Sequence, residues 1–185
     1  MNAEELKTLL KDKQMAERII RFGSEVNEVT IQACLEKIQG LYYKDQEKAI
    51  VMHISTGGGN TSASHSFYQT VRLHGVNLIT IASGRCASAG NMLLLSAAKE
   101  KRFSTPTTIF LVHPPRTTYK ERRMCAKDLK EELVNMKLLE QFEEEIFVNE
   151  TNITKEDYKK HIADDIYFTP EQAKEHGLVH EIISF

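Results

Sequence analysis

Short runs of aliphatic and β-branched residues alternate along this chain with segments whose apolar positions recur every three or four residues. Each run is bounded by Gly, Pro or polar residues, which is typical of buried strands. The expected strands are residues 50–54, 78–82, 109–112 and 179–183. Because helical patterns of suitable length separate them, the chain predicts an α/β fold of stacked βα units with a largely parallel sheet.

The longest helical pattern runs from Tyr119 to about Asn149. One interpretation is that one face of this helix packs on the sheet while the side that carries the three glutamates of residues 143–145 faces solvent. A shorter helix is expected from the capping box that begins at Thr169, with Pro at its first position and Gly177 at its end. The apolar positions of the long helix are Leu129, Leu133, Met136, Leu138, Leu139, Phe142, Ile146 and Phe147.

A stretch of small residues joins the second expected strand to an apolar helical segment. It reads Gly84-Arg85-Cys86-Ala87-Ser88-Ala89-Gly90, in which Arg85 is the only large residue. A hydroxyl at the first turn of a buried helix lies near unpaired N–H groups and the positive end of the helix dipole, where a developing negative charge is stabilised. Ser88 is therefore a candidate nucleophile, although most serines at helix starts only cap the helix.

Three consecutive glycines, residues 57–59, follow the first expected strand. Because they carry no side chains, their backbone N–H groups can face a ligand. A simple turn is the alternative interpretation of this loop. A phosphate cradle is disfavoured, because no Lys follows the glycines and the spacing Gly-x-Gly-x-x-Gly is absent.

His113 and Asp165 are the other candidate site residues. His113 directly follows the strand expected at residues 109–112, and open α/β sheets place functional groups at the carboxyl ends of their strands. Asp165 lies in the connection just before the helix that starts at Thr169. The remaining histidines lie in a strand, in a helical pattern or in polar segments, and we expect them to serve packing or the surface: His53, His65, His74, His161, His176 and His180.

Six strings, in this order, resemble the proteolytic subunit of the Clp protease (ClpP), a family of serine peptidases. The similarity runs without obvious gaps from about residue 18 to residue 183. Six strings at family-like spacing are hard to obtain by chance. They are Thr56-Gly57-Gly58-Gly59, Gly84-Arg85-Cys86-Ala87-Ser88-Ala89-Gly90, Lys101-Arg102-Phe103-Ser104-Thr105-Pro106, Leu111-Val112-His113-Pro114-Pro115, Asp164-Asp165-Ile166-Tyr167-Phe168 and Ala173-Lys174-Glu175-His176-Gly177-Leu178-Val179-His180.

The resemblance implies a catalytic triad in which Ser88 is the nucleophile, His113 the general base and Asp165 the residue that orients the base. It also implies an oxyanion hole formed by the backbone N–H groups of Gly59 and Ala89. The chemistry agrees with this assignment, because a serine hydroxyl needs an adjacent base, the base needs a carboxylate, and the tetrahedral intermediate needs fixed donors. No cofactor and no metal are expected.

The resemblance further implies a ClpP/crotonase-like fold in a single domain, residues 1–185, with an N-terminal segment over residues 1–17. A handle region, about residues 114–149, is expected to project a helix through which two rings stack. The chain would then be an endopeptidase subunit of stacked heptameric rings that hydrolyses peptides or unfolded proteins inside a chamber. An ATP-dependent AAA+ unfoldase is the expected partner.

Composition fits one globular domain. The chain has 185 residues, of which 41% are hydrophobic and 27% charged, and its formal net charge of −2 gives no reason to expect nucleic acid or an anionic membrane as partner. No apolar run approaches the ~20 residues that span a bilayer. The charged start is unlike a targeting segment, and the scattered cysteines, Cys34, Cys86 and Cys125, predict free thiols in the cytoplasm. Cys86 is expected to fill a small packing slot.

The chain departs from the family pattern on either side of the expected triad. The glycine-rich segment that follows the family's His is replaced by residues 116–123, which carry four basic side chains. Asp164 stands where the family has an Arg, so two adjacent carboxylates repel each other unless a cation intervenes. Lys120, Arg122 and Arg123 are the candidate cations. The alternative is that Asp164 points into solvent.

Two other functions stay open. One is a catalytically silent ring subunit, which the Ser, His and Asp disfavour but which the altered residues 116–123 and Asp164 keep open. The other is a crotonase-type enzyme, which shares the fold and a glycine-lined oxyanion hole and acts on acyl-CoA thioesters. Such an enzyme does not need a Ser, a His and an Asp together, so their joint presence argues against it.

Overall fold

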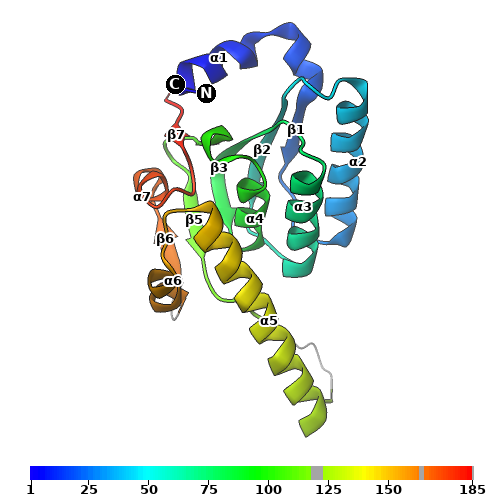
Figure 1. The fold of residues 1–185 in the computed structure, drawn as a ribbon, viewed down its shortest axis with the longest axis vertical. Coiled ribbons are helices and arrows are strands. Elements are labelled where there is room, and N and C mark those ends of the chain that lie inside the picture. The colour runs from blue at the N-terminus through cyan, green and yellow to red at the C-terminus, as the bar shows by residue number, and fades with distance from the viewer. Residues whose placement is uncertain (118–122, 163–164, 185) are drawn as a thin grey trace.

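The computed structural model shows one central sheet with helices around it and one long helix, α5, that projects from the body (Figure 1). It describes residues 1–117, 123–162 and 165–184. The strands are β1 (Ile19–Phe22), β2 (Ile50–Thr56), β3 (Leu78–Ala87), β4 (Arg102–Ser104), β5 (Ile109–Val112), β6 (Ile166–Phe168) and β7 (Glu181–Ile182). The helices are α1 (Ala3–Lys11), α2 (Glu28–Lys44), α3 (Thr61–Leu73), α4 (Ala89–Leu95), α5 (Ala126–Glu150), α6 (Lys155–Ile162) and α7 (Pro170–Glu175).

Strand β3 is the point at which the sheet forks. It pairs in parallel with β2 on one side, while on its other side Thr80–Ala82 pair with β4 and Arg85–Ala87 pair with β5. Beyond these strands, β1 extends the sheet from β2, β7 extends it from β4, and β6 pairs antiparallel with β5. The predicted α/β fold with a largely parallel sheet is confirmed.

The strands differ in extent from those expected. The strand expected at residues 78–82 continues to Ala87, because β5 supplies a partner for the small residues that follow. The strand expected at residues 179–183 is reduced to Glu181–Ile182. Strands β1, β4 and β6 were not expected at all, since runs of three or four residues carry too little alternation to be recognised.

Alternate residues of β2 face the two sides of the sheet, as the period of two requires. Ile50, Met52 and Ile54 belong to the larger apolar cluster, which also takes in residues of α2, α3 and α4. Val51 belongs to a second cluster on the other face, where Leu6 of α1 is fully buried. The N-terminal helix therefore covers one face of the sheet.

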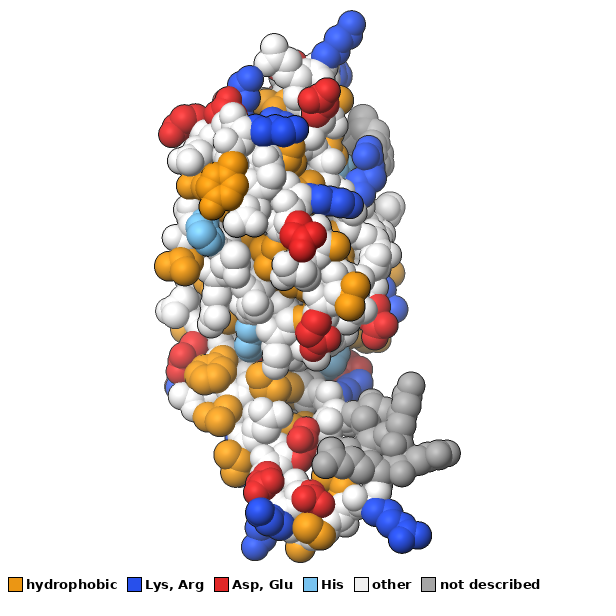
Figure 2. All heavy atoms as spheres, turned by 90° about the vertical axis from the view of Figure 1, so that its right-hand side faces the viewer, with side chains coloured by type: hydrophobic (Ala, Val, Ile, Leu, Met, Phe, Trp, Pro, Cys, Tyr) orange, Lys and Arg blue, Asp and Glu red, His pale blue; other side chains and the backbone are white. Residues whose placement is uncertain are grey.

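Helix α5 begins later than the sequence predicts, and it projects from the body as the family resemblance implies (Figure 1). It starts after Cys125, whose backbone N–H donates to the Asp128 carboxylate at 2.9 Å. Near its end, Ile146 and Phe147 join the larger apolar cluster, but the alternative interpretation, in which one face packs on the sheet, does not hold for most of the helix. Figure 2 shows hydrophobic side chains at the surface of the projecting part, and the exposed ones are Leu129, Leu133, Val134, Leu138 and Phe142. Residues 119–122 of the expected helix lie outside the described residues.

The run of glutamates on α5 is also placed differently from that interpretation. Glu143 and Glu144 are buried, not solvated, because α6 packs against this side of the helix, and only Glu145 is exposed. Glu144 is compensated by Lys155, whose ammonium lies 2.6 Å from its carboxylate. Burial, together with the nearby charge of Glu140, raises the pKa of Glu143 to about 8.

The raised pKa of Glu143 makes stability depend on pH. Because the folded chain holds this proton more tightly than the unfolded chain, its contribution is fully present below the ordinary value of 4.5 and is lost as the pH rises through about 8. Glu143→Gln should remove this loss and raise the free energy of unfolding at pH 8 by up to a few kcal/mol, since one pKa unit corresponds to about 1.4 kcal/mol.

Urea denaturation between pH 5 and about 8.5 measures this effect. The matched control is Glu145→Gln, which alters the exposed neighbour and should leave the pH dependence of the wild type in place. The same pH dependence in wild type and Glu143→Gln would show that the Glu143 carboxyl is not buried in its neutral form.

The three cysteines are free thiols, as the sequence predicts. Cys34 and Cys86 are buried, and Cys125 is exposed. Cys86 has no exposed surface, as a packing role requires, and burial raises its pKa to about 12, so the thiol stays protonated. None of the helices in the described part of the chain has the length and apolar character needed to cross a bilayer.

Candidate active site

Ser88 occupies the turn between β3 and α4. Its backbone has φ 54° and ψ −128°, and no other non-glycine residue in the described part of the chain has a positive φ. The Ser88 N–H donates to the Leu111 carbonyl at 2.8 Å, and its own carbonyl accepts from the Asn91 N–H at 2.9 Å. Its side chain is partly exposed and makes no capping hydrogen bond to the helix. The simple helix cap considered from the sequence is therefore not what this serine forms.

His113 lies beside this turn because β5 runs along the second half of β3. Ala87 is in register with Leu111, two residues before His113. The Leu111 carbonyl also accepts a hydrogen bond from the buried Asn91 side chain at 2.7 Å, which ties the first turn of α4 to β5. Asn91 was not singled out in the sequence, although its place one helical turn after Ser88 is a usable signal.

Asp165 reaches the same place through β6. Val112 is in register with Ile166 in the antiparallel pair, so the next residues along the two strands, His113 and Asp165, lie opposite one another. The sheet thus brings Ser88, His113 and Asp165 to one edge. The pairing of β5 with β6 was not expected from the sequence.

Although the register brings these three residues to one edge of the sheet, their side chains form no hydrogen bond with each other in the described residues. The Nδ1 atom of His113 lies 2.7 Å from the carbonyl oxygen of Pro114. The Asp165 carboxylate forms an ion pair and hydrogen bond with the Arg116 guanidinium. The chain therefore presents the three candidate residues with His113 and Asp165 held by other partners.

The cation beside Asp165 is not one of those expected. Lys120, Arg122 and Asp164 lie outside the described residues, and Arg123 is exposed. Arg116, which belongs to the same basic segment, pairs with Asp165 instead.

The glycine loop packs directly against the Ser88 turn. Gly58 and Gly59 have φ values of 95° and 147°, which favour glycine. A Cβ atom added to Gly58 would lie 2.6 Å from the Ala87 carbonyl oxygen, 2.7 Å from the Ser88 Cβ and 3.1 Å from the Ala89 nitrogen. Only glycine fits this close approach.

Two backbone donors border the contact between the loop and the Ser88 turn. Val26 holds the loop by donating to the Gly58 carbonyl at 2.9 Å and accepting from Asn60 at 2.7 Å. Within the described residues the N–H groups of Gly59 and of Ala89 donate no hydrogen bond. Both are available to a ligand, as the proposed oxyanion hole needs.

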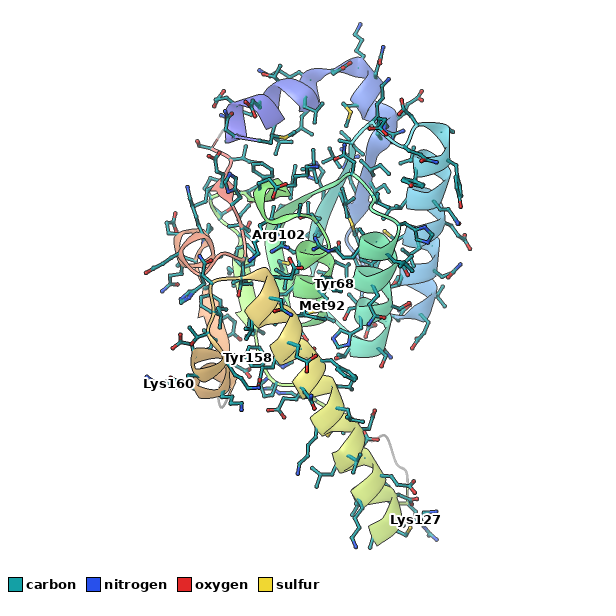
Figure 3. All side chains as sticks on the ribbon, viewed as in Figure 1. Tyr68, Met92, Arg102, Lys127, Tyr158 and Lys160 are labelled. Atoms are coloured by element: carbon teal, nitrogen blue, oxygen red, sulfur yellow. The ribbon has the colours of Figure 1, made fainter. Side chains whose placement is uncertain are left out.

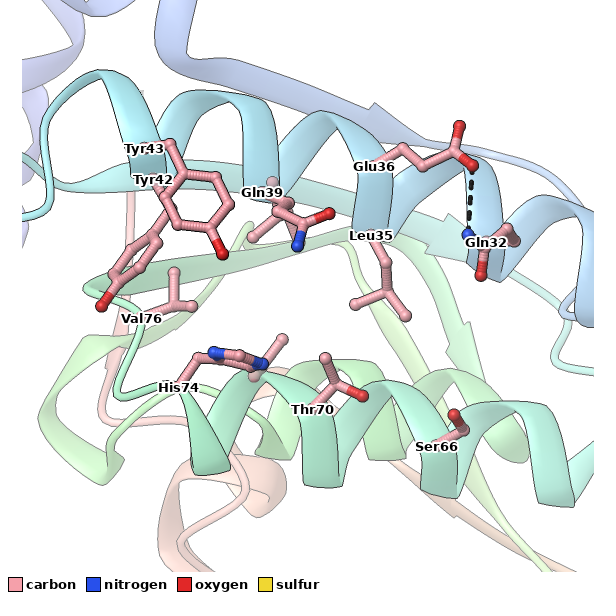
Figure 4. A pocket seen from close by; sticks show the side chains of 12 residues that line it. Gln32, Leu35, Glu36, Gln39, Tyr42, Tyr43, Ser66, Thr70, His74 and Val76 are labelled. Atoms are coloured by element: carbon pink, nitrogen blue, oxygen red, sulfur yellow. Dashed lines mark hydrogen bonds between the residues drawn. The ribbon is translucent and has the colours of Figure 1, made fainter.

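Other candidate centres lie elsewhere. A groove of about 280 Å³ between α2 and α3 is lined by residues that include Leu35, Tyr42, Tyr43, His74 and Val76, and contains none of the candidate site residues (Figure 4).

Among the described residues, no group of three or more His, Cys, Asp or Glu side chains is placed to hold a metal ion.

A strand-to-helix serine, a histidine and an aspartate at one sheet edge, and a glycine loop with free N–H groups are the parts of a serine hydrolase site. A model of the Clp protease family matches residues 2–185, so the chain belongs to the Clp protease family, whose members are serine peptidases.

Two relatives show the degree of similarity. The chain is 29% identical over 169 residues to the ATP-dependent Clp protease proteolytic subunit 1 of Streptomyces avermitilis, a match that covers 91% of this chain and 76% of that protein. It is 28% identical over 169 residues to the ATP-dependent Clp protease proteolytic subunit 2 of Prochlorococcus marinus, covering 91% of this chain and 84% of that protein. The resemblance inferred from the six strings is confirmed.

The close approach of Gly58 gives a test of the site's geometry. Gly58→Ala should slow the reaction of the chain with a fluorophosphonate probe by about 10²-fold, because its methyl group displaces the Ser88 turn and the adjoining donors. Gly57→Ala is the matched control, since a Cβ there meets nothing within 4 Å. The labelling rate, followed by mass spectrometry, should separate the two variants. Equal rates would mean that this loop does not shape the site.

Proposed function

We propose that the chain is a serine endopeptidase subunit in which Ser88 is the nucleophile, His113 the general base and Asp165 the residue that orients His113. The observation that carries the proposal is the sheet register. It puts Ser88 beside β5 and places Asp165 opposite His113, although the three residues are far apart in the sequence. Peptides and unfolded proteins are the proposed substrates.

The proposed reaction follows from these positions. His113 accepts the Ser88 hydroxyl proton as the Oγ atom attacks the peptide carbonyl, and the Asp165 carboxylate stabilises the resulting imidazolium. The N–H groups of Gly59 and Ala89 donate to the oxyanion of the tetrahedral intermediate. His113 then protonates the leaving amine. Water, activated in the same way, hydrolyses the acyl-enzyme and restores Ser88.

A silent ring subunit is the second candidate function, and one observation favours it. Asp165 is paired with Arg116, and His113 faces the Pro114 carbonyl, so the hydrogen bond between His113 and Asp165 that the reaction uses is not formed. The family match favours either of these functions over a crotonase-type enzyme. Labelling of the serine distinguishes the active from the silent subunit.

Ser88→Ala should abolish labelling by serine-directed probes and lower peptide hydrolysis by at least ~10³-fold. The exchange removes one oxygen atom at a partly exposed position, so the fold should persist. Ser66→Ala, which removes a hydroxyl from the surface of α3, is the control and should behave as wild type. If wild type and Ser88→Ala label equally, Ser88 is not the nucleophile. If neither labels, the silent subunit is the better description.

We also propose that the chain assembles into two stacked heptameric rings around a chamber, with the handle region between the rings. The support is the exposed apolar surface of α5, where Leu129, Leu133 and Phe142 are about half exposed. A helix that projects from the body with so much apolar surface gains free energy when a partner covers it.

Sedimentation tests the assembly. The wild type should sediment as a large particle, and Leu133→Asp should convert it to smaller species, because a carboxylate would be buried in the contact between rings. Asn135→Asp adds the same charge at an exposed polar position of the same helix and should leave the large particle intact. A wild-type monomer at every salt concentration would rule out the rings.

The remaining expectations stay predictions. The family works in oligomeric rings with Clp ATPases, and we propose an AAA+ unfoldase as the partner that would supply unfolded protein to this subunit. The cytoplasmic location is likewise proposed. Asp164 lies outside the described residues. Its role can be tested with Asp164→Arg, which restores the residue that the family resemblance implies.

A further inference from the structure

One carboxylate has two possible partners in this site. As the residue that orients His113, Asp165 must accept a hydrogen bond from the Nδ1–H of that histidine. In the structure its Oδ1 atom is bound by the Nη2 group of Arg116, and the His113 Nδ1 atom lies at the Pro114 carbonyl. The His113 Nδ1 atom and the Asp165 carboxylate are thus each in contact with another residue, and both of these residues, Pro114 and Arg116, lie within three positions after His113.

We propose that Arg116 is a positioning residue that restrains the peptidase by holding Asp165 away from His113. This inference rests on the proposed function and adds a form of regulation to it. Activity is then set by the fraction of subunits in which Arg116 has released Asp165. A ligand that binds the Arg116 guanidinium only when it has left Asp165 raises this fraction, because a ligand shifts an equilibrium toward the state that it binds.

The local chain geometry confines this switch to side chains. The register already places the backbone of Asp165 opposite that of His113, so no strand has to move. Pro114 and Pro115 each have a fixed φ and lack an N–H donor, which limits the backbone between His113 and Arg116. Rotation of the Arg116 and Asp165 side chains, with release of the Pro114 carbonyl by the imidazole, completes the change.

The ion pair is weak enough to open. The Arg116 side chain is 60% exposed and that of Asp165 33% exposed, so water and salt screen their attraction. Exposed pairs of this kind shift an equilibrium by no more than about fivefold. The restraint is therefore partial, and it should relax as salt is added.

Arg116→Gln should raise kcat for a fluorogenic peptide by about threefold to fivefold at low salt, because Asp165 becomes free to bind His113. Raising NaCl from about 0.05 M to 0.5 M should bring the wild type toward the variant, since the screening length falls to a few ångströms. The acid limb of the pH–rate profile should move to higher pH in Arg116→Gln, because the freed carboxylate stabilises the imidazolium.

Two further variants control for charge and for assembly. Arg116→Lys keeps the cation and should resemble the wild type, while Arg21→Gln removes an exposed arginine from β1 and should change neither kcat nor the pH profile. Sedimentation of each variant shows whether the particles are the same size. If Arg116→Gln alters the assembly, Arg116→Met is used in its place. The restraint then predicts that kcat rises with salt in the wild type but not in Arg116→Met.

The outcomes separate this inference from the proposed function. If Ser88-dependent labelling is intact but Arg116→Gln is no faster than the wild type, the restraint is wrong. A slower Arg116→Gln would show that Arg116 assists Asp165 instead. If labelling does not depend on Ser88, the proposed function is wrong, and the restraint by Arg116, which rests on it, is wrong as well.

Discussion

The fully buried guanidinium of Arg102 fixes the geometry on which the rest of the structure depends. It donates to the backbone carbonyls of Leu95, Ala97 and Glu150, and it pairs with the Glu150 carboxylate. That carboxylate also accepts from the Tyr68 hydroxyl at 2.8 Å. Figure 3 labels the Arg102 and Tyr68 side chains in the body of the molecule. A buried charge is tolerated only with such partners, so the ends of α4 and α5, strand β4 and helix α3 are held in one arrangement.

This arrangement makes the two sides of the candidate site unequal. Helix α4 is buried along its whole length, tied to β5 by Asn91 at its start and to Arg102 at its end, so the Ser88 turn is rigidly supported. His113 and Asp165 lie beyond the fork of β3, where the Asp165 carboxylate is held by one exposed ion pair with Arg116. The proposed nucleophile is therefore preorganised by the core, while the proposed base and its carboxylate depend on a surface interaction.

The sequence predicted the features that rest on local pattern and on motif. The core strands, the capping box at Thr169 and the buried thiol of Cys86 follow from apolar runs, cap residues and small neighbours. The register between β5 and β6 could not be predicted, because β6 has only three residues and carries no pattern of its own. The burial of Glu143 and the pairing of Arg116 depend on α6 and on Asp165, which are distant in sequence.

The backbone of Ser88 has a consequence for how such a chain changes over many generations. A side chain at φ 54° carries a conformational cost of about 1 kcal/mol or more, which glycine would avoid. Mutational drift in a chain that needed only a turn here would therefore favour glycine, the residue already present at positions 84 and 90 on either side. If the Ser88 hydroxyl is the nucleophile, as we propose, it is obtained at a measurable loss of robustness.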